Sequence, residues 1–344
     1  MVTRRVTLAE VASQAGVSGT TVSFVLSGRA AEMRISVDAQ QRVLRAADEL
    51  GYRPNLTARS LRTTVTQTIG LVSDSIASTQ YAGQVIRGCV DAARKHGRLL
   101  FIAETEGDPE VERRLVEGML DRQVDGLIYA AMFTRTVELP SAVRSGPVVL
   151  LNCLTKGLDG PSVIPDEVGG GRAAARALLD AGHRSGIVAI GGHQRIEATP
   201  GGVFAGRERM RGIREVLREE RVRLARVVEC AWDSPDNGYR EVKALLAAGA
   251  PPKALICAND RLACGAYQAM AEHGLRVPED VSVVSFDDSD LASWLRPQLT
   301  SVALPHYEMG RLAVELLATG QLRTVTHRVP MPARIRASIA APRS

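Results

Sequence analysis

Eight short apolar runs alternate with helical patterns between residues 69 and 286, and no other feature of the sequence constrains the fold as strongly. The runs are Ile69–Val72, Leu99–Ala103, Gly126–Ala130, Val148–Leu151, Ile187–Ile190, Val227–Cys230, Ala254–Cys257 and Val281–Phe286. Runs of this kind are typical of buried parallel strands, and the helices between them complete βαβ units. Two sets of such units predict two doubly wound lobes with a cleft between them. Ligands of such folds bind outside the carboxyl ends of the strands.

The first fifty residues follow the pattern of three helices instead. Thr7 can cap the first helix, Gly16 breaks it, and Ser18 is a good N-cap for the second. We expect a third helix from about Ser36 to Gly51. The apolar residues assigned to the helical core are Leu8, Val11, Ala12, Ala15, Val22, Val25, Leu26, Val43, Leu44, Ala47 and Leu50. Residues 55–63 form a short fourth helical candidate, which is too short to be stable alone in water.

The positive charge is concentrated in this helical head. Residues 1–64 carry nine Arg and five acidic residues, a net of +4, whereas the whole chain has a formal net charge of only +5. A basic head on a nearly neutral body suggests that the head binds a polyanion, although a solvated charged face explains the charge equally well.

Several classes of protein are excluded. The first βα turn lacks the glycines of a dinucleotide-binding site, and no phosphate-binding loop, nucleophile elbow or zinc motif occurs, so we expect neither an enzyme nor a metal or cofactor. The five Cys include no CxxC pair and lie in apolar stretches, which favours free thiols. The N-terminus lacks an apolar signal segment and no run of 18 apolar residues occurs, so we expect a cytoplasmic protein without a membrane span.

A set of motifs gives a closer match than these patterns. The segment Thr7-Leu-Ala-Glu-Val-Ala-Ser-Gln-Ala-Gly-Val-Ser-Gly-Thr-Thr-Val-Ser-Phe-Val-Leu-Ser-Gly28 resembles the N-terminal signature of the lactose/galactose repressor (LacI/GalR) family. Further blocks resemble the same family in the expected order: Gly51–Asn55, Ala58–Arg62, Val124–Ile128, Ala258–Ala263, Val277–Ser282 and Phe286–Asp288. The resemblance implies a DNA-binding transcription regulator, expected to be a repressor, with a periplasmic-binding-protein-like core that senses a small molecule.

The resemblance also assigns the DNA-binding residues. It places Gly19, Thr20 and Phe24 at base-reading positions and Ser18, Thr21 and Ser23 at phosphates. None of the three reading positions carries a long hydrogen-bond donor, and Phe24 can touch only apolar surface such as a thymine methyl or pack on its own domain. The family's hinge helix implies that Leu61 enters the minor groove, or packs on the partner hinge helix, while Arg59 and Arg62 contact phosphates.

The family's effector pocket maps onto six residues at predicted strand ends. They are Asp74, Asp166, Arg209, Trp232, Asp260 and Asp287. Acids accept hydrogen bonds from vicinal hydroxyls, Arg donates to sugar oxygens and an aromatic ring covers a C–H face, so the set favours a sugar over an acidic metabolite. Asp166 and Asp260 can instead cap helices, and Trp232 can be core. A nucleoside or other non-sugar effector, or ligand-independent DNA binding, remains the alternative function.

The expected organisation has three parts. Residues 1–54 form a helix-turn-helix headpiece, residues 55–67 a hinge helix and linker, and residues 68–344 the effector-binding core. Within the core, the N-lobe takes about 68–165 and 305–334, and the C-lobe about 166–304 and 335–344. We expect a homodimer on a palindromic operator, because one head offers little contact area and the tail has no heptads for a tetramer. Residues 191–206 predict a long Gly-rich loop, either a wall of the cleft or a surface insertion.

Overall fold

The computed structural model describes residues 6–53, 65–79, 83–156, 160–194, 202–249 and 251–343. The chain divides into two compact units, residues 1–66 and 67–344. The hinge residues Arg59, Leu61 and Arg62 lie outside the described residues. Among the described residues, no helix is long and apolar enough to cross a bilayer.

The first unit contains three helices, α1 (Leu8–Ala15), α2 (Gly19–Leu26) and α3 (Val37–Glu49). Thr7 and Glu10 form a capping box at the start of α1, and Gly16, with a φ of 64°, ends it. Buried Val11, Val22 and Val43 bring the three helices together, as the sequence predicts. The prediction for Leu44 is wrong: its side chain is 54% exposed, and Ala46 is buried on that turn instead.

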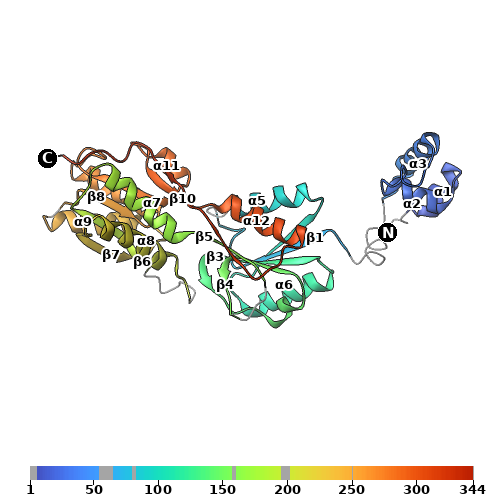
Figure 1. The fold of residues 1–344 in the computed structure, drawn as a ribbon, viewed down its shortest axis with the longest axis horizontal. Coiled ribbons are helices and arrows are strands. Elements are labelled where there is room, and N and C mark those ends of the chain that lie inside the picture. Colours follow the sequence, from blue (N-terminus) through green and yellow to red (C-terminus); the bar gives the residue numbers. More distant parts are fainter. Residues whose placement is uncertain are drawn as a thin grey trace. The chain divides into compact units, whose positions relative to one another are not determined.

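The second unit begins with an N-lobe around a six-stranded parallel sheet, in the order β11-β5-β4-β3-β1-β2. Its strands are β1 (Thr68–Ser73), β2 (Leu99–Glu104), β3 (Gly126–Thr136), β4 (Val148–Leu154), β5 (Ser162–Pro165) and β11 (Thr326–Val329). Helices α5 (Gly83–Lys95) and α12 (His306–Thr319) pack on one face and α6 (Pro109–Asp121) on the other (Figure 1). The short 3-10 helix η1 (Ser141–Ser145) precedes β4.

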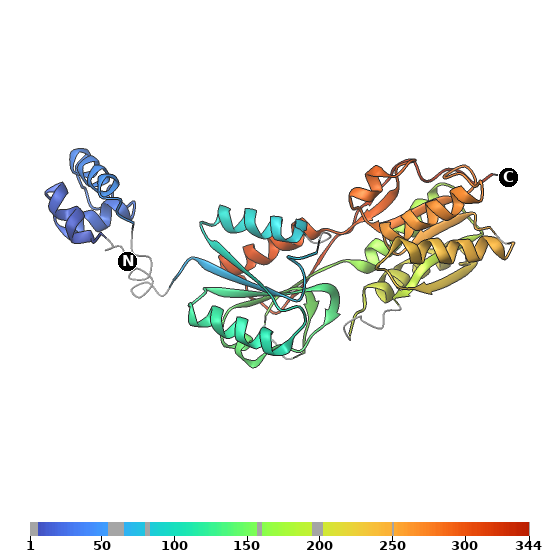
Figure 2. The ribbon, with the colours of Figure 1, turned by 180° about the vertical axis from the view of Figure 1, so that it is seen from behind.

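The C-lobe repeats this plan with the order β12-β10-β9-β8-β6-β7, in which only β12 is antiparallel to its neighbour. Its strands are β6 (Ile187–Gln194), β7 (Arg226–Cys230), β8 (Ala254–Cys257), β9 (Ser282–Asp287), β10 (Thr300–Ala303) and β12 (Ala333–Arg334). Helices α7 (Glu167–Asp180) and α8 (Ala205–Glu219) cover one face, and α9 (Pro235–Ala247) and α10 (Asp260–Glu272) cover the other. The short helix α11 (Asp290–Trp294) follows β9, and the lobe is seen from behind in Figure 2.

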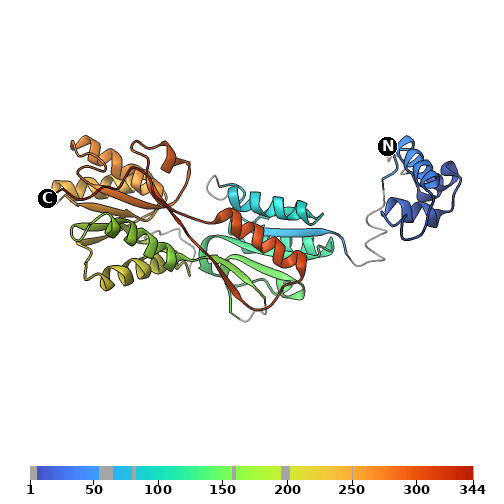
Figure 3. The same cartoon turned by 45° about the horizontal axis from the view of Figure 1, so that its top comes forward.

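The chain passes between the lobes three times, after β5, after β10 and after β11 (Figure 3). The last passage ends at β12, which pairs with β10 of the C-lobe, so Ala333 and Arg334 belong to the C-lobe sheet and not to the N-lobe as the expected boundary at 334 placed them. All eight apolar runs form strands. The expectation that each is buried fails for β2, an edge strand on which Leu99 is 59% exposed.

Candidate effector site and DNA-binding surface

A cavity of about 480 Å³ lies between the two lobes of the core. Its walls come from the carboxyl ends of β3, β4 and β9, from the segments after β7 and β8, and from the first turns of α5, α7, α8 and α12. This volume is in the range of small-molecule sites, which measure about 300–1,000 Å³. The cavity therefore lies where the strand order predicts a ligand site.

Arg209 on α8 forms the buried centre of the C-lobe wall. Its Nε donates to Glu167 Oε2 at 2.5 Å and its Nη2 to Glu167 Oε1 at 3.2 Å, while Nη1 donates to the carbonyl of Ala258 at 2.7 Å. The guanidinium carbon lies 5.3 Å from the centre of the Trp232 ring and 4.7 Å from that of Phe286. A cation between two aromatic rings and a carboxylate is held in one orientation.

The charge on Arg209 is stabilised despite its burial. Burial acts to lower the pKa of the guanidinium, but Glu167 and the nearby acids Asp287 and Asp260 outweigh it, so the pKa is raised. Both Arg209 and Glu167 are almost fully buried, and the pair lines the cavity as a neutral unit in which three guanidinium N–H groups already have acceptors.

Asp287 lines the same wall in an unusual backbone conformation. It has a φ of 105° and Asp288 a φ of 51°, two consecutive residues in a region that disfavours side chains other than glycine. Burial raises the pKa of Asp287 to about 7, nearby Asp260 adds to the rise, and Arg209 and Arg261 oppose it. A ligand that donates hydrogen bonds to this carboxylate would favour its ionised form.

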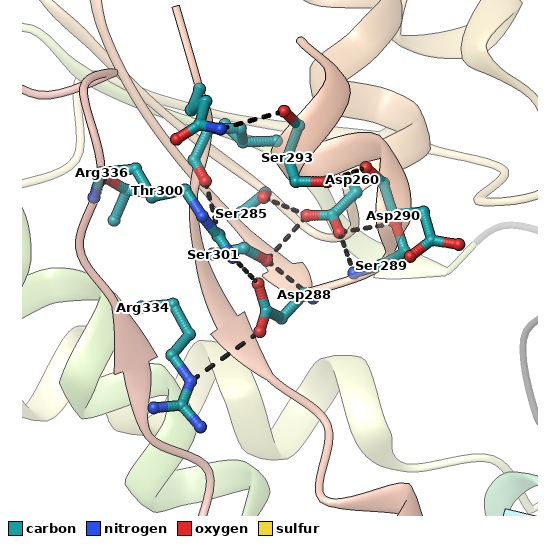
Figure 4. A network of polar contacts seen from close by, with 12 residues as sticks. Asp260, Ser285, Asp288, Ser289, Asp290, Ser293, Thr300, Ser301, Arg334 and Arg336 are labelled. Carbon is teal, nitrogen blue, oxygen red and sulfur yellow. Dashed lines mark hydrogen bonds and ion pairs between the residues drawn. The ribbon is translucent and has the colours of Figure 1, made fainter. Parts of the chain in front are cut away.

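The strained turn is held by a polar network beneath it (Figure 4). Asp260 is fully buried and accepts hydrogen bonds from the hydroxyls of Ser285, Ser301 and Ser289 and from the backbone N–H of Ser289 at 2.7 Å. Burial raises the pKa of Asp260, while these serine hydrogen bonds act in the opposite direction. The network fixes the chain on both sides of the turn, since Ser285 precedes Asp287 and Ser289 follows it.

Asp288 connects this turn to the last passage between the lobes (Figure 4). Arg336 Nη2 donates to Asp288 Oδ1 at 2.5 Å, and Arg334 Nε lies 3.9 Å from Asp288 Oδ2. The backbone N–H of Asp288 donates to the Ser301 hydroxyl at 2.9 Å. Both arginines follow the segment that returns from β11 of the N-lobe, so the residue beside Asp287 is bound to the chain that joins the lobes.

The N-lobe wall is formed by an irregular section of β3. The pairing of β3 with β4 shifts register between Ala130 and Arg135, and the intervening Met132 and Phe133 line the cavity. Asn152 Nδ2 donates to the carbonyls of Ala131 and Met132, each at 2.9 Å, and Asn152 Oδ1 accepts from the hydroxyl of Thr134 at 2.7 Å. Asn152 thus fixes the bulge from the side of β4.

The start of α8 is attached to this bulge by main-chain hydrogen bonds. The N–H of Thr136 donates to Gly202 at 3.1 Å, and the N–H of Phe204 donates to Thr134 at 3.0 Å. The predicted loop 191–206 is therefore shorter than expected, because Gly191–Gln194 belong to β6 and α8 begins at Ala205. Ala205 also lines the cavity.

Three of the six sequence-predicted effector residues line the cavity, namely Arg209, Trp232 and Asp287. The other three are not among the described residues that line it. Asp166 caps α7, accepting from the N–H of Gly169 at 3.0 Å. Asp260 lies in the network beneath Asp287, and the cap of α10 is Asn259, not Asp260. Asp74 lies behind the β3 bulge.

Asp74 supports the bulge from the side of β1. Its carboxylate accepts from the N–H of Met132 at 2.8 Å and from Arg135 Nη2 at 3.2 Å. Asp74, at the end of β1, therefore shapes the N-lobe wall by holding the backbone of the neighbouring strand β3.

Sequence reasoning missed several residues of the cavity. They are Gln84, Met132, Phe133, Asn152, Glu167, Asn259, Arg261, Trp294 and His306, among others. Glu167 gave a usable signal, since it is an acid directly after Asp166, which the sequence offers as a helix cap. Asn259 and Arg261 lie in the family block Ala258–Ala263, whereas Met132, Phe133 and Trp294 gave no signal, because a bulge or a short helix after a strand has no pattern of its own.

The predicted DNA-binding residues on α2, the second helix of the headpiece, differ in how far they are exposed to solvent. Thr20 is exposed, whereas Gly19, Ser23 and Phe24 are half-buried. The Ser18 hydroxyl caps α2, accepting from the N–H of Thr21 at 3.1 Å and lying 2.9 Å from the Thr21 hydroxyl. The guanidinium carbon of Arg29 lies 5.4 Å from the centre of the Phe24 ring. Phe24 therefore has a partner in its own domain and is only half-buried.

No cluster of three His, Cys, Asp or Glu side chains suited to a metal ion occurs in the part of the chain that the structure describes. A three-helix unit with a capped second helix, followed by two doubly wound lobes around a cavity, is the architecture of a DNA-binding transcription regulator that senses a small molecule. The chain belongs to the lacI family of bacterial regulatory proteins, whose family model matches residues 7–55, and a periplasmic binding protein-like domain matches residues 175–339.

Similar proteins support this assignment over nearly the whole chain. The ribose operon repressor of Haemophilus influenzae is 32% identical over 316 residues, which cover 90% of each chain. The structure of a lac repressor dimer bound to operator and the anti-inducer ONPF matches with a TM-score of 0.78 and 27% identity over 98% of this chain and 100% of that one. The complex of the transcriptional regulator CelR with cellobiose matches with a TM-score of 0.65 and 29% identity over 97% and 100%.

Proposed function

We propose that this protein is a cytoplasmic transcriptional repressor whose affinity for a palindromic operator changes when a sugar binds in the cavity between the two lobes of its core. The observation that carries the proposal is the C-lobe wall, where the carboxyl group of Asp287, the Arg209 guanidinium paired with Glu167, and the indole of Trp232 line one cavity. Hydroxyl pairs suit the carboxylate, and the C–H face of a sugar ring suits the indole. The cellobiose complex of a related regulator supports a carbohydrate.

The charges of the wall argue against an anionic effector. Among the described residues, two arginines line the cavity, and each lies near a carboxylate: Glu167 occupies two donors of Arg209, and the charge of Arg261 acts on Asp287. A neutral polyol needs donors and acceptors but no counter-ion. The wall supplies both.

DNA binding is proposed through α2 and the hinge. Exposed Thr20 and half-buried Phe24 would contact base edges together with Gly19, and Thr21 and Ser23 would approach phosphates. Ser18 already caps α2, and a hydroxyl can donate its proton to a phosphate while its lone pair accepts from the backbone. Arg59, Leu61 and Arg62 would act from the hinge, with the Leu61 side chain in the minor groove.

A homodimer fits this mode of binding. The outer strand of the N-lobe, β2, exposes Leu99, Phe101 and Ile102, and an exposed apolar edge strand is a natural site for a second copy of the chain. Two heads related by a two-fold axis would bind two half-sites of a palindrome. The dimeric lac repressor bound to operator supports this arrangement.

Thermal unfolding of the full chain with a panel of neutral sugars, sugar phosphates and nucleosides tests the effector class. We expect a rise in Tm with one or more neutral sugars that is lost in Asp287→Ala and kept in Asp180→Ala, a variant of an exposed acid that does not line the cavity. A rise with nucleosides alone, or an equal rise in Asp287→Ala, would refute the sugar assignment.

Operator and random duplexes of equal length test the DNA contacts. Leu61→Ala should weaken operator binding much more than random-duplex binding, because only the specific complex gains the opened base step. Arg59→Ala should weaken both and lower the salt slope by about 1. Equal losses on both duplexes for Leu61→Ala would assign Leu61 to ordinary packing.

A further inference from the structure

Three consecutive glycines, Gly169, Gly170 and Gly171, lie near the start of α7. Glycine is a poor helix former, because it loses more conformational freedom on folding than any other residue. The same helix begins at Glu167, whose carboxylate holds Arg209 in the C-lobe wall of the cavity. A run that weakens a helix directly beside the cavity indicates that the glycines are needed for close contacts.

Two of these glycines lie against different parts of the protein. A methyl group at Gly170 would approach the side chain of Met331, in the last passage between the lobes, to 2.9 Å. A methyl group at Gly171 would lie 2.1 Å from the carbonyl oxygen of Arg209 on α8. The Met331 side chain is flexible and can move aside, whereas a carbonyl within a helix is fixed by the hydrogen bonds of that helix.

The contact between α7 and α8 is reciprocal. Gly212 lies on α8 one turn beyond Arg209, and a methyl group there would lie 2.0 Å from the carbonyl oxygen of Val168 on α7. The two helices therefore touch backbone to backbone at this crossing. Because non-bonded heavy atoms pack at about 3.5 Å, a methyl group on either glycine would push the helices apart by on the order of 1 Å.

The ion pair of the cavity wall spans the same crossing. Glu167 directly precedes Val168, and the carbonyl that faces Gly171 belongs to Arg209 itself. The bonds from Arg209 Nε and Nη2 to the Glu167 carboxylate measure 2.5 and 3.2 Å. A hydrogen bond is lost by about 3.6 Å, so a helix separation of about 1 Å would break the longer bond and stretch the shorter one.

The N-lobe contains a similar crossing that serves as a natural comparison. A methyl group at Gly88 of α5 would lie 2.0 Å from the carbonyl oxygen of Tyr307 on α12. The ion pair between these two helices, Lys95 with Glu315, lies at the surface, and the lysine side chain is 70% exposed. A change at Gly88 therefore disturbs a helix crossing of the same kind without displacing a buried ion pair of the cavity wall.

We propose that Gly171 and Gly212 are positioning residues of the effector site, because the close approach of α7 and α8 that they permit holds Arg209 against Glu167 in the orientation that recognises the ligand. This inference rests on the proposed function and concerns the same site. Neither glycine is among the described residues that line the cavity, whereas both partners of the ion pair are. The two glycines act on recognition from behind the wall.

Calorimetry on the full chain tests the proposal, with whichever of glucose, galactose, ribose and cellobiose raises the Tm of the wild type most as the probe. Gly171→Ala should lower the affinity by at least about tenfold. Gly88→Ala should lose a similar amount of thermal stability but less than about threefold in affinity. Gly118→Ala on α6, where a methyl group lies 3.5 Å from Arg122 Nη1, should change neither.

Fluorescence gives a measurement that needs no ligand. The chain has two tryptophans, so in a Trp294→Phe background the emission comes from Trp232 alone. The Arg209 guanidinium carbon lies 5.3 Å from the centre of the Trp232 ring. In this background Gly171→Ala should shift the Trp232 emission maximum, because the cation beside the indole moves, whereas Gly88→Ala should leave it unchanged.

Glu167→Asp keeps the proposal testable if Gly171→Ala does not fold. The shorter side chain withdraws the carboxylate from Arg209 while both glycines and the helix crossing stay as they are. It should lower the sugar affinity and shift the Trp232 emission as Gly171→Ala does. Wild-type affinity and emission in Glu167→Asp would show that the spacing between the two partners does not matter, which would overturn the proposal.

The outcomes separate this inference from the proposed function. Gly171→Ala with nearly wild-type affinity, or with a loss no larger than that of Gly88→Ala, would overturn the positioning role and leave a sugar sensor. A wild-type Tm that rises with none of the sugars would overturn the proposed function. The Trp232 emission would still decide in that case, because an unchanged maximum in Gly171→Ala would show that the glycines do not position Arg209.

Discussion

The two walls of the effector cavity are constructed in different ways. The C-lobe wall contains charges held by a buried ion pair and by a strained turn over a network of serines. The N-lobe wall is a bulge of β3 that carries Met132 and Phe133 and is held by the neutral amide of Asn152. From this difference we infer, on the function proposed above, that the C-lobe wall selects the ligand and the N-lobe wall covers it. Substitutions on the two walls should therefore have unequal effects.

The largest effect is expected at the buried ion pair. Arg209→Ala leaves Glu167 buried without its partner, which should lower the free energy of unfolding by about 3–5 kcal/mol and abolish the effector response. The double variant Glu167→Gln/Arg209→Met removes both charges and should recover most of the stability but none of the response. Urea unfolding of the three proteins measures this. An Arg209→Ala variant as stable as the wild type would contradict a rigid C-lobe wall.

Asp287 should produce the next largest effect, and its sign depends on pH. The carboxyl has a pKa of about 7 in the folded protein and about 3.9 when unfolded, so folding favours the protonated form. The contribution of Asp287 to the free energy of unfolding is fully present below pH 4 and is lost as the pH rises through 7. Each pKa unit corresponds to about 1.4 kcal/mol, so Asp287→Asn should be more stable than the wild type at pH 8, by up to a few kcal/mol.

Effector affinity should follow the opposite trend. If the ligand donates to the Asp287 carboxylate, its affinity for the wild type should rise between pH 6 and pH 8. At pH 6 part of the binding free energy is used to ionise Asp287, whereas at pH 8 the carboxyl is already ionised. Isothermal titration at three pH values checks this, with Asp180→Asn, an exposed acid outside the cavity, as the control that keeps the wild-type profile. A flat profile in the wild type would mean that Asp287 does not accept from the ligand in its ionised form.

A smaller effect is expected where the C-lobe wall meets the chain that joins the lobes. Arg336→Ala removes the ion pair with Asp288 and should lower effector affinity by about five- to tenfold, equivalent to about 1–1.4 kcal/mol, by loosening the turn that carries Asp287. Arg336→Lys should restore part of it, whereas a contact made directly by Arg336 to the ligand would not tolerate Lys. Titration of both variants with the same sugar decides this.

The N-lobe wall should give the smallest effect. Asn152→Ala removes three hydrogen bonds around the bulge, and since both polar atoms of this amide already have partners inside the protein, we expect effector affinity to fall by only about threefold. The measurement is the same titration, with unfolding in urea as a check that the lobe remains folded. A loss as large as that of Asp287→Ala would remove the distinction between the two walls.

Much of the fold was accessible from the sequence because it depends on local patterns. Apolar runs such as Ile69–Val72 and caps such as Thr7 and Ser18 report structure directly, and all eight runs became strands. The exposure of Leu99 was not accessible, because the position of a strand within a sheet depends on connections and not on its own composition. Short strands such as β12 lack a pattern long enough to recognise.

The site was harder to predict because the same residue types serve recognition and support. Asp74, Asp260 and Asp287 all stand near strand ends, yet only Asp287 faces the cavity, and the other two hold the backbone of the walls. What separates them is which backbone N–H groups and hydroxyls lie within reach, and this depends on strands brought together from distant parts of the sequence. The position of Trp294 likewise depends on how β9 ends.

Operator binding with and without a sugar tests the central claim most directly. The full-length wild-type protein and Asp287→Ala would be titrated onto an operator duplex, each with and without the neutral sugar that raises Tm in the wild type. We predict that the sugar changes the operator affinity of the wild type by at least about tenfold and leaves that of Asp287→Ala unchanged, while both proteins bind equally well without it. An equal change in both proteins, or no change in the wild type at a saturating sugar concentration, would contradict a cavity whose C-lobe wall controls DNA binding.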